Sequence, residues 1–320
     1  MALSSQEALA VVGLTVRQVA DCVDRECAEG SPHLVGSLAS GLGNGRSDVD
    51  VHVLAPGLDH AVGPTLHQIT GVTIDVEQYP AVWAAQAVAR LGAVPAVERP
   101  FGRISLDRAV DEYQRGWLSR WIHSVPVRSA GGAVFSEADV QVLLPGLVRQ
   151  AHDRVLIDAA VALLADDADR RGSPVYSASA RDYFWARAAR GLLELRCRAA
   201  GDVTTGEKWL PARARRLGLR AVPRDGEVGP RVLAGLGWSA AEILAAVLVG
   251  PAPDAAPAEL AGRRFLVNRH DRLLESWISP HGGLDAVLEE HSPAAVLHAV
   301  RSAACDLTVD EALVRERLAA

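Results

Sequence analysis

The stretch Val35-Gly-Ser-Leu-Ala-Ser-Gly-Leu-Gly-Asn-Gly-Arg-Ser-Asp-Val-Asp-Val-His-Val-Leu54 holds the clearest structural signal in this chain. Its pattern predicts a short strand, a glycine-rich loop and a second strand. Because successive side chains of a strand point to opposite faces, Asp48, Asp50 and His52 share one face and the valines between them take the other. Two carboxylates on a rigid strand beside such a loop suit a divalent metal that carries a phosphate chain. The alternative is an ordinary hairpin with solvated aspartates.

A further strand is predicted between Gly71 and Tyr79, where apolar and polar residues alternate. The apolar residues take one face, and Asp75 and Glu77 lie on the other. Acidic residues are uncommon at strand centres, so these two carboxylates call for a reason. The competing interpretation is an edge strand whose charges face solvent.

Composition restricts the possible classes of protein. The 320 residues suffice for a sizeable core and most simply form two domains, and the hydrophobic content of 49% indicates a globular chain. The net charge of −6 argues against a general nucleic-acid-binding surface, although it leaves room for a local basic groove. The four scattered cysteines predict no disulfide framework. Neither a signal peptide nor a membrane span is predicted, so we expect a cytoplasmic protein.

Lys208 is the single lysine among the 33 basic residues. In a chain so biased towards arginine, a retained lysine suggests a position that needs a compact ammonium group. Lysine commonly binds phosphate as a point charge. Pro211 is tolerated in the first turn of a helix, so Lys208 is expected just before a helix, where anions are favoured. Chance retention is the alternative.

The periodicity of the remaining sequence predicts an α+β N-terminal part and a helical remainder. In the first part we expect a helix over residues 5–29, a loop over 56–64, helical structure over 81–121 with an interruption around 92–100, and a linker over 124–132. A capping box at Ser136–Asp139 opens the next helix. Further helices are predicted over residues 137–164, 178–200, 209–217, 240–249, 264–278, 284–290 and 294–304. The expected domains are residues 1–130 and 131–320.

The strand–loop–strand stretch resembles the signature of the DNA polymerase β-type nucleotidyltransferase superfamily, a Gly-Ser pair followed after a spacer by Asp-hydrophobic-Asp-hydrophobic. Gly36-Ser37 and Asp48-Val49-Asp50-Val51 fit both the residue types and the spacing. A second, weaker likeness links Cys197-Arg198, Thr205-Gly206 and Lys208 to the second domain of bacterial aminoglycoside adenylyltransferases, where a lysine contacts the triphosphate. It covers only a short part of the chain.

The resemblance implies a fold and a set of site residues. The fold is a polymerase β-like nucleotidyltransferase domain, a small mixed sheet with helices, followed by an all-helical domain. The implied metal ligands and catalytic carboxylates are Asp48, Asp50 and Asp75, with Glu77 the alternative to Asp75. The implied nucleotide-contacting residues are Gly36, Ser37, Ser47, Arg198 and Lys208.

The implied activity is the Mg²⁺-dependent transfer of a nucleoside monophosphate, AMP from ATP, to a hydroxyl of a small-molecule acceptor, with release of pyrophosphate. The sequence does not identify the acceptor, and no membrane partner is expected. A tRNA or protein acceptor is the first alternative, because four arginines between residues 213 and 220 could line a basic cleft. A non-catalytic nucleotide sensor is the second, and a helical interaction protein with an incidental Asp-x-Asp hairpin is the third.

Overall fold

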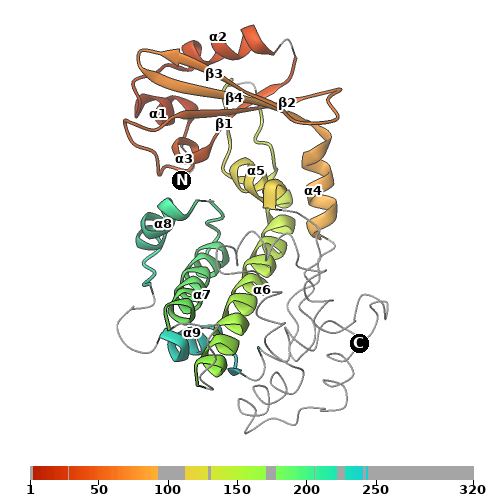
Figure 1. Ribbon diagram of the computed structural model, residues 1–320. Helices are drawn as coiled ribbons and strands as arrows, with labels where there is room; N and C mark the ends of the chain where they lie inside the picture. Colours follow the sequence, from red (N-terminus) through yellow and green to blue (C-terminus); the bar gives the residue numbers. More distant parts are fainter. Residues whose placement is uncertain are drawn as a thin grey trace. The chain divides into compact units, whose positions relative to one another are not determined.

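The computed structural model describes residues 3–27, 29–92, 112–128, 131–170, 178–204, 206–221, 228–240 and 243 (Figure 1). Two compact units divide the chain. The first comprises Met1–Pro95, Arg108–Leu147 and Ala200–Gly218, and the second comprises Ala96–Asp107, Val148–Ala199 and Leu219–Ala320. These units do not follow a single cut at residue 130, because the chain returns to the first unit after residue 199.

A five-stranded mixed sheet forms the centre of the first unit, as the α+β prediction requires. Its strands are β1 (Ser31–Val35), β2 (Val49–Ala55), β3 (Val62–Ile69), β4 (Val72–Pro80) and β5 (Val125–Pro126). They lie in the order β3-β4-β2-β1-β5. Strands β2 and β4 run parallel, and the other neighbours are antiparallel. The two strands with the predicted carboxylates are therefore direct neighbours away from both sheet edges.

One face of the sheet is the apolar face that the alternation predicts. Val49, Val51 and Ile74 are fully buried there. Side chains from helices α1 (Ser5–Ala10), α2 (Val16–Glu26) and α3 (Gly36–Ala39) complete this cluster. The prediction of one helix over residues 5–29 was wrong. Gly13 has a φ of +75°, and Thr15 starts α2 with a capping box, so the chain turns and begins a second helix.

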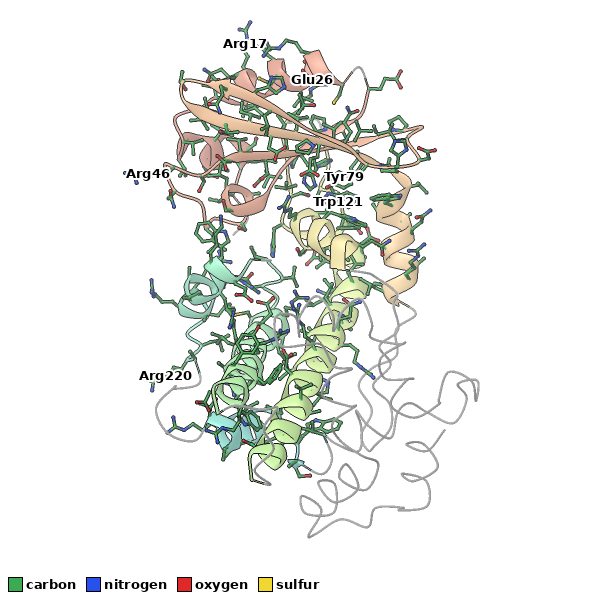
Figure 2. The ribbon with its side chains drawn as sticks, in the orientation of Figure 1. Arg17, Glu26, Arg46, Tyr79, Trp121 and Arg220 are labelled. Atoms are coloured by element: carbon green, nitrogen blue, oxygen red, sulfur yellow. The ribbon has the colours of Figure 1, made fainter. Side chains whose placement is uncertain are left out.

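The opposite face carries a second, aromatic cluster. It gathers side chains from β4, from helices α4 (Val82–Gly92) and α5 (Glu112–Ile122), and from the start of α6 (Glu137–Arg170). Tyr79 and Trp121 are labelled in Figure 2, and their rings meet edge to face with centroids 5.5 Å apart. The sheet is thus covered on both faces. The polar side chains of β2 and β4 on the aromatic side are therefore partly shielded from water.

Two strands were missed by the sequence interpretation. Part of β3 falls in the predicted loop over residues 56–64, and β5 falls in the predicted linker over 124–132. Strand β3 has mostly exposed side chains on both faces, so it lacks the alternation that marks a half-buried strand. It forms through its antiparallel pairing with β4 across the turn at Thr70 and Gly71. Strand β5 has two residues, too few for any pattern.

Within the second unit, the described chain is helical. Besides the continuation of α6, it contains α7 (Ala178–Ala199) and α9 (Val228–Leu236), which was not predicted. Glycines allow close packing here, since a Cβ on Gly191 would meet Val155 at 3.0 Å and one on Gly229 would meet Trp185 at 2.9 Å. The helices predicted between residues 240 and 304, like Cys305, lie largely outside the described residues. No helix among the described residues has both the length and the apolar character needed to span a membrane.

The remaining helices confirm two sequence predictions. Ser136 caps α6 by accepting the Asp139 N–H at 3.1 Å, and the Asp139 carboxylate accepts the Ser136 N–H at 2.9 Å. The helix predicted over residues 209–217 is present as the short 3-10 helix η1 (Glu207–Trp209) followed by α8 (Leu210–Arg216). Both belong to the first unit, and Pro211 occupies the first turn of α8.

Candidate functional site

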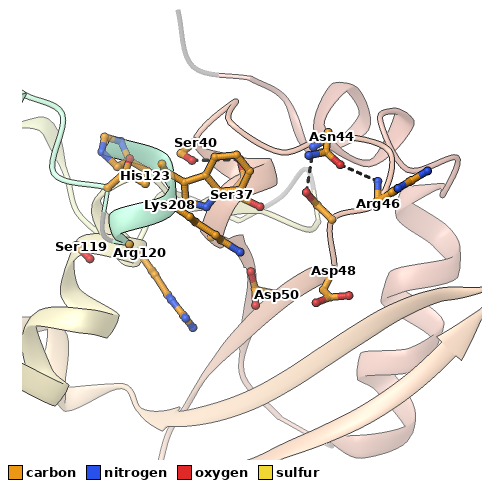
Figure 3. Close-up of a pocket in the computed structure, with 15 residues that line it drawn as sticks. Ser37, Ser40, Asn44, Arg46, Asp48, Asp50, Ser119, Arg120, His123 and Lys208 are labelled. Carbon is orange, nitrogen blue, oxygen red and sulfur yellow. Dashed lines mark hydrogen bonds between the residues drawn. The ribbon is translucent and has the colours of Figure 1, made fainter. Parts of the chain in front are cut away.

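A pocket of about 540 Å³ opens in the first unit and gathers most of the predicted site residues (Figure 3). This volume is in the range of small-molecule sites. The lining residues are Gly36, Ser37, Ser40, Asn44, Arg46 and Ser47 from α3 and the loop, Asp48 and Asp50 at β2, Ser119, Arg120 and His123 at α5, and Thr204, Gly206, Lys208 and Trp209 before α8. The carboxylates and the lone lysine thus border one cavity, although 158 residues or more separate them in sequence (208 − 50).

The glycine-rich loop begins at a position that only glycine suits. Gly36 has a φ of +70°, and a Cβ there would collide with Oδ2 of Asp50. The loop then folds on itself, because the Ser37 carbonyl accepts the N–H groups of Leu42 at 2.9 Å and Gly43 at 2.8 Å. Near its end, the Ser47 hydroxyl accepts the Asn44 N–H at 3.0 Å. The loop therefore holds a defined shape around the Asp50 carboxylate.

Asp50 and Asp75 are register partners on the adjacent strands β2 and β4. Burial raises the pKa of Asp50; Arg120 opposes this effect, while the nearby Asp75, Asp48 and Glu77 carboxylates add to it. Burial and Glu77 likewise raise the pKa of Asp75, whose Oδ1 is buried without a hydrogen-bond donor. The edge-strand interpretation was wrong, because β4 pairs with a strand on each side. Nor is Asp50 a solvated hairpin residue, whereas Asp48 is exposed at the pocket.

Glu77 lies on the same face but is already engaged. Its Oε2 accepts the Tyr79 hydroxyl at 2.5 Å, and its Oε1 lies 3.8 Å from Nη1 of Arg120. Asp75, in contrast, has an oxygen without a donor and lies directly opposite Asp50. Of the two candidates for a third carboxylate, Asp75 is therefore the one with an oxygen that lacks a donor among the described residues, although that oxygen is buried and neither residue lines the pocket.

His52 lies on the same face of the sheet as these carboxylates and is uncharged. Its Nδ1 accepts the Trp121 indole N–H at 2.8 Å. Burial, aided by the charge of Arg120, lowers the pKa of His52 to about 3. The ring is therefore uncharged at neutral pH, and its remaining proton is on Nε2.

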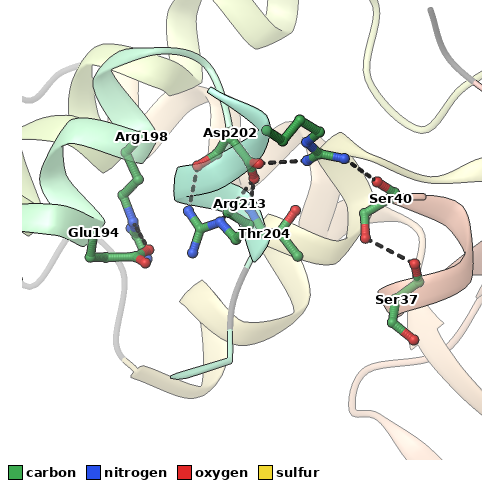
Figure 4. Close-up of polar contacts among 8 residues, drawn as sticks. Ser37, Ser40, Glu194, Arg198, Asp202, Thr204 and Arg213 are labelled. Carbon is green, nitrogen blue, oxygen red and sulfur yellow. Dashed lines mark hydrogen bonds and ion pairs between the residues drawn. The ribbon is translucent and has the colours of Figure 1, made fainter. Parts of the chain in front are cut away.

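A buried ion cluster explains how the segment before α8 reaches the pocket (Figure 4). Asp202 accepts hydrogen bonds from Arg213 at 3.0 Å, from Arg216 at 2.5 Å and from the Thr204 N–H at 3.2 Å. Arg216 also donates to the Ser40 carbonyl at 2.8 Å. Because Ser40 follows α3, this pair of contacts ties the Lys208 segment to the glycine-rich loop.

Lys208 itself is exposed at the pocket. Its ammonium lies over the Trp209 ring, 5.2 Å from the centroid, and no carboxylate among the described residues pairs with it. Figure 3 shows Lys208 bordering the same cavity as Asp48 and Asp50. A phosphate between them could meet the ammonium directly. Thr205, part of the resemblance, is outside the described residues.

Three other candidate arginines form contacts within the chain, and the predicted contact of Arg198 with a nucleotide stays a prediction, since its Nη1 has no hydrogen-bond partner among the described residues. Arg198 belongs to the second unit and donates to Glu194 at 2.7 Å. Arg213 is fully buried, and Arg216 is hydrogen-bonded to Asp202. Of the arginine run proposed for an RNA acceptor, Arg213 and Arg216 therefore contribute to the fold, whereas Arg215 and Arg220 are exposed.

Sequence reasoning missed the pocket residues Ser119, Arg120, His123 and Thr204. None of them carried a signal that distinguishes it: Arg120 is one of many arginines, and the residues around it show only a helical period. Ser119, Arg120 and His123 reach the pocket because α5 packs against the sheet. Thr204 reaches it because the Asp202 cluster positions its segment.

The donor set suits a hard cation. Asp48, Asp50 and Asp75 offer only carboxylate oxygens, which Mg²⁺ prefers, and one oxygen of Asp75 is buried without a donor. Across the part of the chain that the structure describes, no three His, Cys, Asp or Glu side chains converge as a ready metal-binding group. The three-carboxylate metal site thus stays a prediction. No family model matches this chain, and no curated protein matches it either.

Proposed function

We propose that this chain is a metal-dependent nucleotidyltransferase that moves AMP from ATP to a hydroxyl of a small molecule and releases pyrophosphate. The carrying observation is the shared pocket, where the Asp48 and Asp50 carboxylates, the glycine-rich loop and Lys208 border one cavity. An incidental Asp-x-Asp hairpin would give no reason for a lysine from a distant segment to border the same cavity. The likeness of Gly36-Ser37 and Asp48-Val49-Asp50-Val51 to polymerase β-type nucleotidyltransferases supports the same reaction.

Each group has a proposed role. Asp48, Asp50 and Asp75 would hold Mg²⁺, which when bound would neutralise phosphate charge. Gly36, Ser37 and Ser47 contact the phosphates along the loop, and Lys208 offsets the charge that grows on the leaving pyrophosphate. Alternatively, Asp75 does not bind the metal, and its carboxylate accepts the proton of the attacking hydroxyl.

The test is pyrophosphate release from ATP with Mg²⁺ across a panel of hydroxylated acceptors, together with calorimetric binding of a non-hydrolysable ATP analogue. Asp48→Asn and Asp50→Asn should each lower turnover by about 10²-fold or more, because each removes a charge that stabilises the transition state. Asp59→Asn is the matched control, since Asp59 is an exposed loop residue outside the pocket. Absence of metal-dependent triphosphate binding, or unchanged binding in the Asp48→Asn/Asp50→Asn double variant, would overturn the proposal.

A further inference from the structure

Arg120 is a pocket residue with a charge that the fold does not fully use. It extends from the last turn of α5, and its side chain is 39% exposed. Its closest carboxylate is Glu77, whose Oε1 lies 3.8 Å from Nη1, too far for a hydrogen bond. Figure 3 shows Arg120 among the residues that line the pocket.

The other polar contact of Arg120 is not a hydrogen bond either. Nη1 lies 3.5 Å from Nε2 of His52. Because Trp121 donates to Nδ1 of the neutral His52 ring, Nε2 carries the proton and is a donor. Two donors face each other, so the guanidinium has no hydrogen-bond acceptor among the described residues.

Two more polar atoms on this side of the pocket lack partners. Nε2 of His123, which follows α5, and Oγ1 of Thr204 are buried without a hydrogen bond. The Thr204 hydroxyl is near enough to Asp202 to help lower its pKa, yet it makes no hydrogen bond of ordinary geometry. Buried polar groups without partners cost stability, and a ligand that bonded to them would recover that cost.

We propose that Arg120 is a second phosphate-binding residue, which takes phosphoryl oxygens of the nucleotide from the α5 side while Lys208 binds them from η1. A guanidinium presents a planar fork of donors that matches phosphate oxygens two at a time, whereas an ammonium binds as a point charge. The inference rests on the proposed function, because the phosphates are those of its nucleotide. His123 and Thr204 extend the same wall with neutral hydrogen-bonding groups.

The rival role for Arg120 is that of a counter-charge which only holds the neighbouring carboxylates in place. Arg120→Lys separates the two roles, because it keeps the positive charge and removes the planar fork. Arg120→Met removes both. Arg215→Lys and Arg215→Met are the matched controls, since Arg215 is exposed on α8 and does not line the pocket.

The measurement is the calorimetric Kd of inorganic tripolyphosphate and of an ATP analogue, with Mg²⁺, for the full-length chain and each variant. Arg120→Met should weaken both ligands by about 10-fold or more, and Arg120→Lys by several-fold, because hydrogen bonds between charged groups are stronger than neutral ones. The Arg215 variants should bind like the wild type. Thermal unfolding of each variant without ligand checks that the fold is retained.

Each other outcome is decisive. If Arg120→Lys binds tripolyphosphate as the wild type does while Arg120→Met does not, the charge alone accounts for binding, the guanidinium fork has no part in it and the inference is overturned. Equal binding by wild type and both variants overturns it as well, and leaves the proposed function intact. If the wild-type chain binds neither tripolyphosphate nor the ATP analogue, the proposed function fails and this inference fails with it.

Discussion

Asp202 and the pair Asp50 and Asp75 are carboxylates of the first unit that are shielded from water, but their charged neighbours differ. Asp202 is 5% exposed; although burial alone would raise its pKa, the hydrogen bond from Arg216 and the charge of Arg213 lower it. Asp50 and Asp75, on neighbouring strands, have raised pKa values because burial and adjacent carboxylates outweigh Arg120. One oxygen of Asp75 has no donor. The charge of Asp202 is thus balanced by arginines, whereas the charges of Asp50 and Asp75 are not fully balanced.

The difference separates a group that serves the fold from groups that serve a ligand. Asp202 is satisfied entirely from within the chain, and its cluster positions the Lys208 segment. The Asp50 and Asp75 pair costs stability at neutral pH, because like charges on adjacent strands repel and burial disfavours ionisation. Such a loss of stability is typical of functional sites, where a bound cation can offset the repulsion. The comparison predicts opposite responses when each carboxylate is removed.

The largest effect is expected from Asp202→Ala. It would leave the buried Arg213 guanidinium and Arg216 without their carboxylate, so we expect the free energy of unfolding to fall by roughly 3–5 kcal/mol. Asp24→Ala is the control, because Asp24 pairs with Arg128 at the surface and exposed pairs contribute at most about 1 kcal/mol. Urea unfolding measures both. If Asp202→Ala lowers the free energy of unfolding no more than Asp24→Ala does, Asp202 does not stabilise the fold more than a surface ion pair.

A smaller effect is expected from Gly36→Ala, which acts on the uncompensated side of the comparison. An alanine at φ +70° costs about 1–2 kcal/mol of stability, and its Cβ would displace the Asp50 carboxylate. Gly57→Ala is matched, because Gly57 has a φ of +80° and an added Cβ would meet nothing within 4 Å. Both variants should lose stability through the positive φ, Gly36→Ala more than Gly57→Ala because of the collision with Asp50, whereas metal-dependent triphosphate binding should weaken in Gly36→Ala alone. Equal binding by both variants would show that the position of Asp50 does not depend on Gly36.

The sequence predicts well the parts of the site that a local pattern defines. The alternation of valines with Asp48 and Asp50, and of apolar residues with Asp75, predicts strands whose apolar faces are buried in the structure. Lys208 was found through its rarity and through the likeness of Cys197-Arg198 and Thr205-Gly206 to adenylyltransferases. Each of these signals is contained in a few consecutive residues or in the composition itself, so no knowledge of the tertiary structure was needed.

What the sequence could not predict depends on packing between distant segments. Strand β3 follows from pairing with β4 rather than from its own pattern, since most of its side chains are exposed. Arg120 lies in the pocket because α5 packs on the aromatic face of the sheet, and nothing local distinguishes it from other arginines. Arg198, expected at the nucleotide from a likeness, donates through Nε to Glu194 in the second unit, and its contact with a nucleotide stays a prediction.

The most direct test of the difference between Asp202 and the Asp50 and Asp75 pair is the pH dependence of stability in metal-free buffer. Raised pKa values mean that folded Asp50 and Asp75 hold protons more tightly than in the unfolded chain. Their contribution is thus fully present below the ordinary value of 3.8 and is lost as pH rises through the raised pKa values. Asp202 has the opposite sign, because its stabilisation is present above 3.8 and is lost as pH falls through its lowered pKa.

Urea unfolding from about pH 3 to about pH 7 separates these terms, since each proton changes stability by at most about 1.4 kcal/mol per pH unit. Relative to the wild type, Asp50→Asn should gain stability as pH rises, because the neutral amide removes the cost of ionising a buried carboxyl. Asp202→Asn should lose stability over the same rise, because its arginine partners keep their charge while the carboxylate is gone. The two variants could instead deviate from the wild-type curve in the same direction. That result would mean that ionisation of Asp50 and ionisation of Asp202 have the same effect on stability.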